Sequence, residues 1–248
     1  MSTEEKIKNK FLYSGGLNFF KICYFFFQYF KGIIKLKKSY SNWGIDMMAD
    51  SFFTNRNNGV YIDVGCHHAF LNNNTYPLYK RGWNGINIDI DFNSVDSFNF
   101  FRRNDSNIQI AASFKKGETD LFFYHNRSAI NTLSKEHGSN AKEIRSIKTD
   151  TLNNIINNSK FKEKKINFLS IDVEGFELNV LKGFDFKKYR PELVVIEFIQ
   201  PHIKEFFFQK IENIQNSELY TFMMRQDYKF INWIHDDLVF VPNDIKKS

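Results

Sequence analysis

The feature that most constrains the fold is the stretch of residues 167–183, NFLSIDVEGFELNVLKG. A short apolar run, Phe168–Ile171, ends at two acids, Asp172 and Glu174, and at Gly175, after which apolar residues recur at helical spacing. This order predicts a strand, an acidic corner and a helix. In open α/β sheets, ligands bind beyond the carboxyl ends of the strands, so both acids are expected to face a binding crevice.

The same alternation of apolar runs and helical spacing extends along most of the chain. Besides 168–171, the predicted strands are 60–62, 86–88, 108–112 and 193–198, followed by a strand pair at 229–234 and 238–241. Helices are expected over 39–58, from 74 to 81, around 94–102, after 175, and over most of 200–224. Strands that alternate with helices at this spacing indicate βαβ units, so the expected fold class is α/β with a parallel sheet.

Residues 115–150 interrupt this alternation. They contain one short predicted strand, 121–124, and a polar loop, 126–138. We interpret 115–150 as an insertion or cap over the crevice, within a main domain of residues 51–248.

Residues 1–50 form an aromatic and basic N-terminal segment in this interpretation. Its stretch 17–34 approaches the roughly 20 apolar residues that a membrane span needs, but Lys21, Gln28 and Lys31 interrupt it. Three alternatives remain open. The stretch is a helix packed on the domain, an interfacial helix whose following lysines meet anionic headgroups, or a true span.

Charge and cysteine content bear on the location of the protein. The net charge of +6 is compatible with an anionic partner or surface, although a solvated basic face is the commoner explanation. Cys23 and Cys66 lie in unrelated contexts, which indicates a reducing compartment, and the charged first residues do not resemble a secretory signal. The expected location is the cytoplasm, with residues 17–38 as the candidate for peripheral contact with the inner face of the membrane.

Acids also follow the first two strands. Asp63 ends the first one, and Gly65 right after it lets backbone approach a nucleotide-like ligand without a Cβ in the way. Asp89 ends the second strand, where an acid commonly accepts hydrogen bonds from two ribose hydroxyls; Asp91 is the near alternative. Ala69 stands where the dinucleotide fingerprint would have a further glycine, which disfavours a NAD enzyme. Together these residues favour a nucleoside-containing cofactor.

A second group of residues suits catalysis or metal binding. Asp172 and Glu197 end neighbouring predicted strands and His202 follows, so these three are candidate ligands of one divalent cation; the alternative is that the carboxylates accept backbone N–H bonds at a helix start. Glu177 either shares a helical face with Glu174 or lies in water. His67, in the first turn, is a candidate general base or a structural histidine.

Three stretches, Tyr61–Gly65, Gly82–Asp89 and Ile171–Gly183, resemble the FkbM family of S-adenosylmethionine-dependent methyltransferases. Arg190-Pro191 and the strand that ends in Glu197 continue the similarity, which covers roughly residues 59–200. The run D-V-E-G-F-E at 172–177 is the most specific part of it.

The resemblance implies a class I methyltransferase fold, a Rossmann-like sheet of seven strands with the last one antiparallel and with helices on both faces. It also implies S-adenosylmethionine, with its methionine end near Asp63 and Gly65, its ribose on Asp89 and its adenine near Ala111 and Ala112. Members typically methylate hydroxyl groups, often on sugars or natural products. The sequence departs from the family pattern at the turn of residues 66–69, at Ser170, where lysine is frequent, and at Asp89, where glutamate is frequent.

Methyl transfer from a sulfonium needs an aligned acceptor and removal of its proton, and a sugar hydroxyl is a poor nucleophile. The candidates for this task are Asp172, Glu174, His67, Glu197 and His202. We interpret the chain as an O-methyltransferase for a sugar hydroxyl of a surface glycan or its precursor, assisted by a base or by Mg²⁺ or Mn²⁺. Nucleic acid is not the expected partner, but methylation of RNA or protein is one alternative, and a non-catalytic S-adenosylmethionine-binding protein is the other.

Overall fold

The structure is a computed structural model that describes residues 39–124, 131–199 and 210–245, together with Phe19, Cys23, Phe26 and Phe27. It divides into two compact units, residues 1–38 and residues 39–248. The four described residues of the first unit are helical and exposed, and the rest of the predicted segment 17–38 lies outside the described residues. Among the described helices, none has the length and apolarity needed to cross a bilayer.

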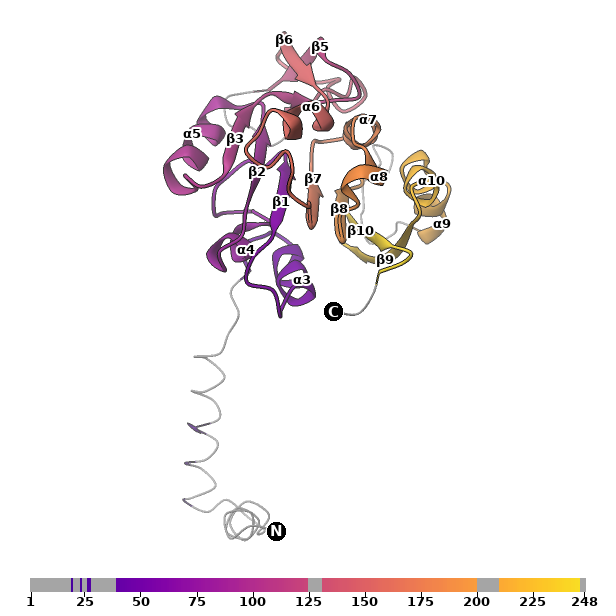
Figure 1. The fold of residues 1–248 in the computed structure, drawn as a ribbon. Helices are drawn as coiled ribbons and strands as arrows, with labels where there is room; N and C mark the ends of the chain where they lie inside the picture. Colours follow the sequence, from indigo (N-terminus) through magenta and orange to yellow (C-terminus); the bar gives the residue numbers. More distant parts are fainter. Residues whose placement is uncertain are drawn as a thin grey trace. The chain divides into compact units, whose positions relative to one another are not determined.

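The second unit is built on a seven-stranded sheet (Figure 1). Its strands are β1 (Val60–Val64), β2 (Asn84–Asp89), β3 (Ser106–Gln109), β7 (Phe168–Ile171), β8 (Leu193–Glu197), β9 (Tyr228–Ile234) and β10 (Asp237–Pro242). Their order is β3-β2-β1-β7-β8-β10-β9, and the final strand, β10, runs antiparallel to both of its neighbours. The expected class I methyltransferase sheet is therefore confirmed.

Alternate residues of the central strands enter two different cores, because successive side chains of a strand point to opposite faces. In β8, Val194 and Ile196 join the larger core, whereas Leu193 and Val195 join the smaller one. The larger core is covered by α6 (Leu152–Asn157), α7 (Glu177–Lys182), α8 (Phe186–Tyr189), α9 (Ile211–Gln215) and α10 (Glu218–Arg225). The smaller core is covered by α3 (Ile45–Phe52) and α4 (Tyr76–Lys80), while α5 (Phe92–Phe101) packs on β2 and β3.

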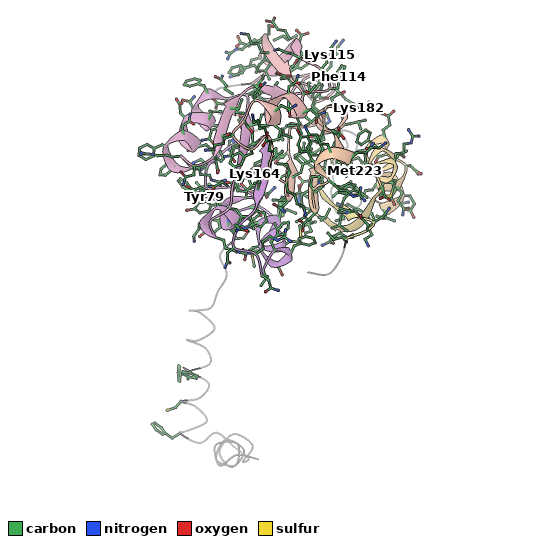
Figure 2. All side chains as sticks on the ribbon, viewed as in Figure 1. Tyr79, Phe114, Lys115, Lys164, Lys182 and Met223 are labelled. Carbon is green, nitrogen blue, oxygen red and sulfur yellow. The ribbon has the colours of Figure 1, made fainter. Side chains whose placement is uncertain are left out.

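Figure 2 draws the described side chains on the ribbon and labels one methionine and three lysines that differ in burial. Met223 of α10 is fully buried, whereas Lys115, Lys164 and Lys182 are exposed on different elements. Such lysines are solvated charges on the surface of the unit.

The boundary between the units lies at Lys38, before the expected one at residue 50. Ile45 and Ala49 of α3 are buried in the smaller core, so this helix belongs to the main domain. The helix is also shorter than the predicted 39–58, because buried Asp46 accepts hydrogen bonds from Ser39 Oγ (2.7 Å) and from Tyr40 N (2.6 Å), which holds the preceding residues in a loop.

The interruption at 115–150 supplies two strands of a small second sheet, of order β4-β6-β5, whose β5 and β6 are visible at the top of Figure 1. This sheet consists of β4 (Ala111–Ala112), β5 (Gly117–Phe123) and β6 (Glu143–Asp150). The strand predicted over 108–112 is therefore wrong as one element. The chain leaves the main sheet after Gln109, and Ala111 and Ala112 pair instead with Thr149 and Asp150 of β6.

Candidate active site

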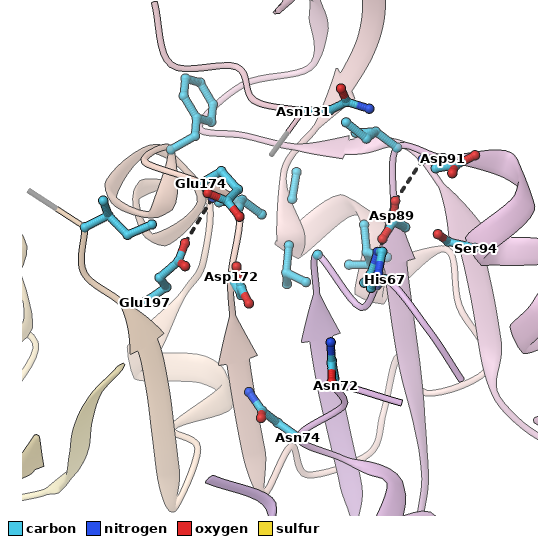
Figure 3. Close-up of a pocket in the computed structure, with 18 of the residues that line it drawn as sticks. His67, Asn72, Asn74, Asp89, Asp91, Ser94, Asn131, Asp172, Glu174 and Glu197 are labelled. Carbon is cyan, nitrogen blue, oxygen red and sulfur yellow. Dashed lines mark hydrogen bonds between the residues drawn. The ribbon is translucent and has the colours of Figure 1, made fainter. Parts of the chain in front are cut away.

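A cavity of about 330 Å³ lies at the carboxyl ends of β1, β2, β7 and β8 (Figure 3). Its walls also include Trp43 and Asn42 from the loop before α3, and Asn131 and Leu133 from the segment between β5 and β6. The volume falls in the range of small-molecule and cofactor pockets, roughly 300–1,000 Å³. The 115–150 segment thus helps to close the cavity.

Gly65, at the end of β1, is required by the approach of two strands. Its φ is +77°, and a Cβ on it would lie 1.6 Å from the carbonyl oxygen of Asp172 at the end of β7. The glycine therefore permits contact between these two strand ends, and it also lines the cavity, where its predicted contact with a ligand stays a prediction. This close approach brings the predicted cofactor residues at the end of β1 next to Asp172, the predicted catalytic residue after β7.

Asp89 ends β2 on the cavity wall, as shown on the right of Figure 3. Its Oδ2 accepts a hydrogen bond from the backbone N of His67 (2.8 Å), and its Oδ1 accepts one from Asp91 N (2.8 Å). Burial raises the pKa of this carboxyl, and the two N–H donors partly oppose the shift. A carboxylate oxygen can accept a further bond, so Asp89 retains capacity for two hydroxyl groups.

Asp91 caps the N-terminus of α5 and also borders the cavity. Its Oδ1 accepts from Asn93 N (3.0 Å), while its buried Oδ2 has no hydrogen-bond partner among the described residues. Ala111 and Ala112, together with Ile90 and Ile110, form an apolar part of the wall nearby. A buried acceptor beside an apolar slot fits a ligand that has both a polar group and a flat ring.

Asp63 does not line the cavity. Its Oδ2 accepts hydrogen bonds from Asn73 Nδ2 (3.0 Å) and Thr75 Oγ1 (2.9 Å), and burial raises its pKa against the opposing charge of Arg102. Arg102 is itself fully buried and donates to Ala69 O (2.8 Å), Asn73 Oδ1 (2.6 Å) and Thr75 Oγ1 (2.8 Å). Asp63 and Arg102 therefore hold the loop between β1 and α4 in place, and the sequence analysis missed Arg102.

The two histidines of this loop differ in surroundings. His67 has a φ of +50° and lines the cavity, with its backbone N on Asp89. His68 Nδ1 accepts from Phe70 N (3.3 Å) and Leu71 N (3.2 Å), which stabilises the turn. Of the pair, only His67 borders the cavity.

The acidic corner after β7 is held by a set of backbone hydrogen bonds. Glu174 has a φ of +56°; its N donates to Glu197 Oε2 (3.2 Å), and its carbonyl accepts from Thr132 Oγ1 (2.6 Å). Glu177 is buried and accepts from Val173 N (3.1 Å) and Gly175 N (2.9 Å), so the interpretation that it lies in water is wrong. The corner keeps a sparsely populated backbone conformation because its surroundings determine it, as is common at functional sites.

Three carboxylates converge at this corner, on the left of Figure 3. Asp172, Glu174 and Glu197 each offer an oxygen, and these oxygens all lie within 4.8 Å of one another. Loss of hydration, together with the charges of nearby acids, raises the pKa of Asp172 to about 7 and that of Glu174 to about 8, and for Asp172 a hydrogen bond with Glu197 opposes part of the rise. The side chain of Asp172 is exposed to the cavity, although protein surrounds it on its other sides. Glu197 is buried, and loss of hydration and the neighbouring acids hold its pKa well above the usual range.

The turn between β9 and β10 adds two more acids, Asp236 and Asp237, to the cavity wall. Here the indole of Trp43 stacks on the ring of His235 at 3.8 Å with an interplanar angle of 8°. These residues were not predicted to belong to the site, although Asp236 and Asp237 lie in the connection between the predicted strands 229–234 and 238–241. His202, the remaining predicted metal ligand, lies outside the described residues.

The cavity thus has an end formed by Asp89, Asp91 and the apolar slot, and an acidic end formed by the corner after β7 and the β9–β10 turn. A family model described as the methyltransferase FkbM domain matches residues 63–230, from the end of β1 into β9. Comparison with curated proteins and with solved structures gives no significant match.

Proposed function

The chain belongs to the FkbM methyltransferase family, and on that premise we propose that it transfers a methyl group from S-adenosylmethionine to a sugar hydroxyl on a surface glycan or its precursor. Membership of the family implies an S-adenosylmethionine-dependent methyltransferase. The observation that carries the proposal is one continuous cavity that is lined by Asp89, Asp91 and apolar side chains at β2 and by acids at β7 and β8.

The residues at the first end fit the cofactor. Asp89 has acceptor capacity left for the two ribose hydroxyls, and the unpartnered Oδ2 of Asp91 is an acceptor for a further polar group. Ile90, Ile110 and Ala111 provide apolar surface for the adenine. When it is bound, S-adenosylmethionine supplies an electrophilic methyl group on a sulfonium.

The residues at the second end suit a hydroxyl acceptor. Asp172 and Glu174 present carboxylate oxygens to the cavity, where they orient a hydroxyl and take its proton. His67, which lines the cavity beside Asp89, is the next candidate for the base. Asn72 and Asn74 add amide groups that can hydrogen-bond to further hydroxyls of a sugar.

The acidic end also bears on the alternatives. An RNA chain would bring backbone phosphates beside Asp172, Glu174 and Glu197, which is unfavourable while these acids are ionised and hold no cation. A sugar hydroxyl brings no charge of its own, and the diphosphate of a nucleotide sugar can stay outside this end of the cavity. A non-catalytic binding protein would have no need for a strained acidic corner beside the cofactor end.

The test is methyl transfer in vitro. The full-length protein is incubated with S-adenosylmethionine carrying a labelled methyl group and with a panel of polysaccharide fragments and nucleotide sugars. We expect S-adenosylhomocysteine to form only with a sugar acceptor and mass spectrometry to locate the label on oxygen. Asp172→Asn should lose this activity, and Asp96→Asn, an exposed acid on α5, should retain it. Label on RNA or protein instead, or cofactor binding without transfer to any acceptor, would overturn the proposal.

We also propose that residues 17–38 contact an anionic membrane surface. The support is an aromatic stretch followed by Lys35, Lys37 and Lys38, and the exposure of Phe19, Phe26 and Phe27. The full chain should sediment with vesicles that contain phosphatidylglycerol, and replacing the three lysines by glutamine should release it. Equal sedimentation with neutral vesicles would contradict this.

A further inference from the structure

We propose that Asp172, Glu174 and Glu197 bind one divalent cation of the Mg²⁺ or Mn²⁺ class, with Asp237 beside them, and that this cation holds the acceptor. The inference rests on the proposed function, because it assigns the acceptor end of the same cavity. It differs from the sequence-based ligand set, in which His202 stood in the place of Glu174.

The separation of the oxygens suits a small cation. The three carboxylates present oxygens within 4.8 Å of one another. Oxygens on opposite sides of an octahedral Mg²⁺ lie roughly 4 Å apart, since each Mg–O bond is about 2.1 Å. Adjacent oxygens around such an ion lie roughly 3 Å apart, so side-chain rotations that bring the three carboxylates about 1–2 Å closer together would close the site around an ion.

The charges at this corner call for a cation. The described charged groups that act on Asp172, Glu174 and Glu197 are themselves acids, chiefly Glu177 and Asp236. No lysine or arginine forms an ion pair with the three carboxylates within the described part of the chain. Carboxylates are rarely gathered in a protein without pairing or a metal, because each loses hydration.

Asp237 is an independent observation that points to a ligand. Its side chain is 9% exposed and borders the cavity, and it receives no hydrogen bond from any residue that the structure describes. As the first residue of β10, it pairs with Glu197 of β8 across the sheet. The carboxylate of Asp237 borders the cavity, where a cation or bound water would supply the partners that the described residues do not.

The ligands are also held in advance. The left-handed backbone of Glu174 is fixed by its N–H bond to Glu197 Oε2 and by the Thr132 hydroxyl on its carbonyl. Metal sites depend on such orienting contacts around their ligands.

A cation at this corner would leave coordination positions for the acceptor. Hard cations prefer oxygen ligands and commonly keep several positions for water or substrate. Two neighbouring hydroxyls of a sugar are suitable ligands, and coordination makes their protons easier to remove. The cation thereby selects acceptors with adjacent oxygens.

The experiment measures metal binding without cofactor or acceptor. The full-length protein is stripped with a chelator, exchanged into chelator-free buffer and titrated with Mn²⁺, with binding followed by calorimetry and by the electron paramagnetic resonance of free Mn²⁺. We expect one site per chain and a higher melting temperature in the presence of Mn²⁺. Glu174→Gln and Asp237→Asn should each weaken binding by about 10-fold or more, whereas Asp96→Asn should not.

Glu174 is partly exposed, so Glu174→Gln leaves the core intact, and a melting curve without metal checks the fold of each variant. Absence of Mn²⁺ binding by the folded wild type, or equal affinity in Glu174→Gln, overturns the cation site. In that case the carboxylates are neutralised by protonation instead of by a metal ion. Methyl transfer that persists in chelator would accompany that result and leave the proposed function standing. Specific Mn²⁺ binding with no transfer to any sugar would instead overturn the proposed function alone.

Discussion

Replacing Asp89 by asparagine is expected to weaken the binding of S-adenosylhomocysteine without unfolding the protein. In the free protein, both carboxylate oxygens of Asp89 accept backbone N–H groups, from His67 and from Asp91, at 2.8 Å each. The remaining acceptor capacity faces the cavity, where we place the ribose hydroxyls. Asparagine keeps the shape of the side chain but removes the charge and turns one oxygen into a donor.

The magnitude follows from the bonds affected. Asparagine still accepts on one side, so the ribose loses one hydrogen bond to a charged acceptor and keeps a weaker one. A bond of this kind contributes about 1–3 kcal/mol, which corresponds to a Kd about 5-fold to about 150-fold higher. The new NH₂ group also faces one backbone N–H in the free and the bound protein alike, so this contact should lower the free energy of unfolding rather than the affinity.

Isothermal titration calorimetry with S-adenosylhomocysteine measures the loss of affinity. The 2′-deoxy analogue of S-adenosylhomocysteine then shows whether the loss comes from the contact with the ribose hydroxyl. Removing the hydroxyl should weaken binding to the wild type clearly more than binding to Asp89→Asn, because the contact is already lost in the variant. Asp96→Asn makes the same change of charge at an exposed position of α5 and should bind like the wild type. Unchanged affinity in Asp89→Asn, or an equal effect of the deoxy analogue on both proteins, would refute the ribose assignment.

Three further changes test other parts of the structure. Gly65→Ala should lower the free energy of unfolding in urea by more than about 2 kcal/mol, because the new Cβ meets the carbonyl of Asp172; wild-type stability would contradict the strand contact. Asp172→Asn should cut the formation of S-adenosylhomocysteine by about 100-fold or more at an unchanged urea midpoint, and a wild-type rate would remove this residue from the site. Burial alone would raise the pKa of Glu192, but its bonds to Arg56 and Lys165 outweigh burial and hold the pKa at about 2, below the ordinary 4.5. Its stabilising contribution is therefore complete above about pH 4.5 and is lost as the pH falls toward 2. Glu192→Gln should make the urea midpoint depend less on pH over that interval. A pH dependence that is unchanged in the variant would count against the ion pairs.

Much of the fold could be predicted because it depends on local patterns. The apolar runs that end in Asp89, Asp172 and Glu197 became β2, β7 and β8 with the acids at or just after their carboxyl ends. Carboxyl ends of parallel strands meet at one edge of a sheet, so their proximity followed from the chain alone. The seven-stranded order followed from the resemblance to a family rather than from periodicity.

Local patterns were misleading where tertiary hydrogen bonds compete with them. Residues 108–112 read as one strand, but Ala111 and Ala112 leave the main sheet because β6 offers them partners. Asp63 was predicted to end a strand as Asp89 does, but β1 continues to Val64, and the side chain of Asp63 lies on the face of the sheet where Asn73 and Thr75 bind it.

The amino-acid sequence by itself determined which residues stand at the ends of the strands, since alternation and helical spacing are properties of contiguous residues. Only the tertiary structure decided which of those side chains face the cavity, and it added Trp43, Asn131 and Asp237 from segments far apart in the chain. The physical reason is that the walls of a cavity form where distant segments pack together, and the burial and charge that they create at Asp172 and Glu174 exist only after that packing.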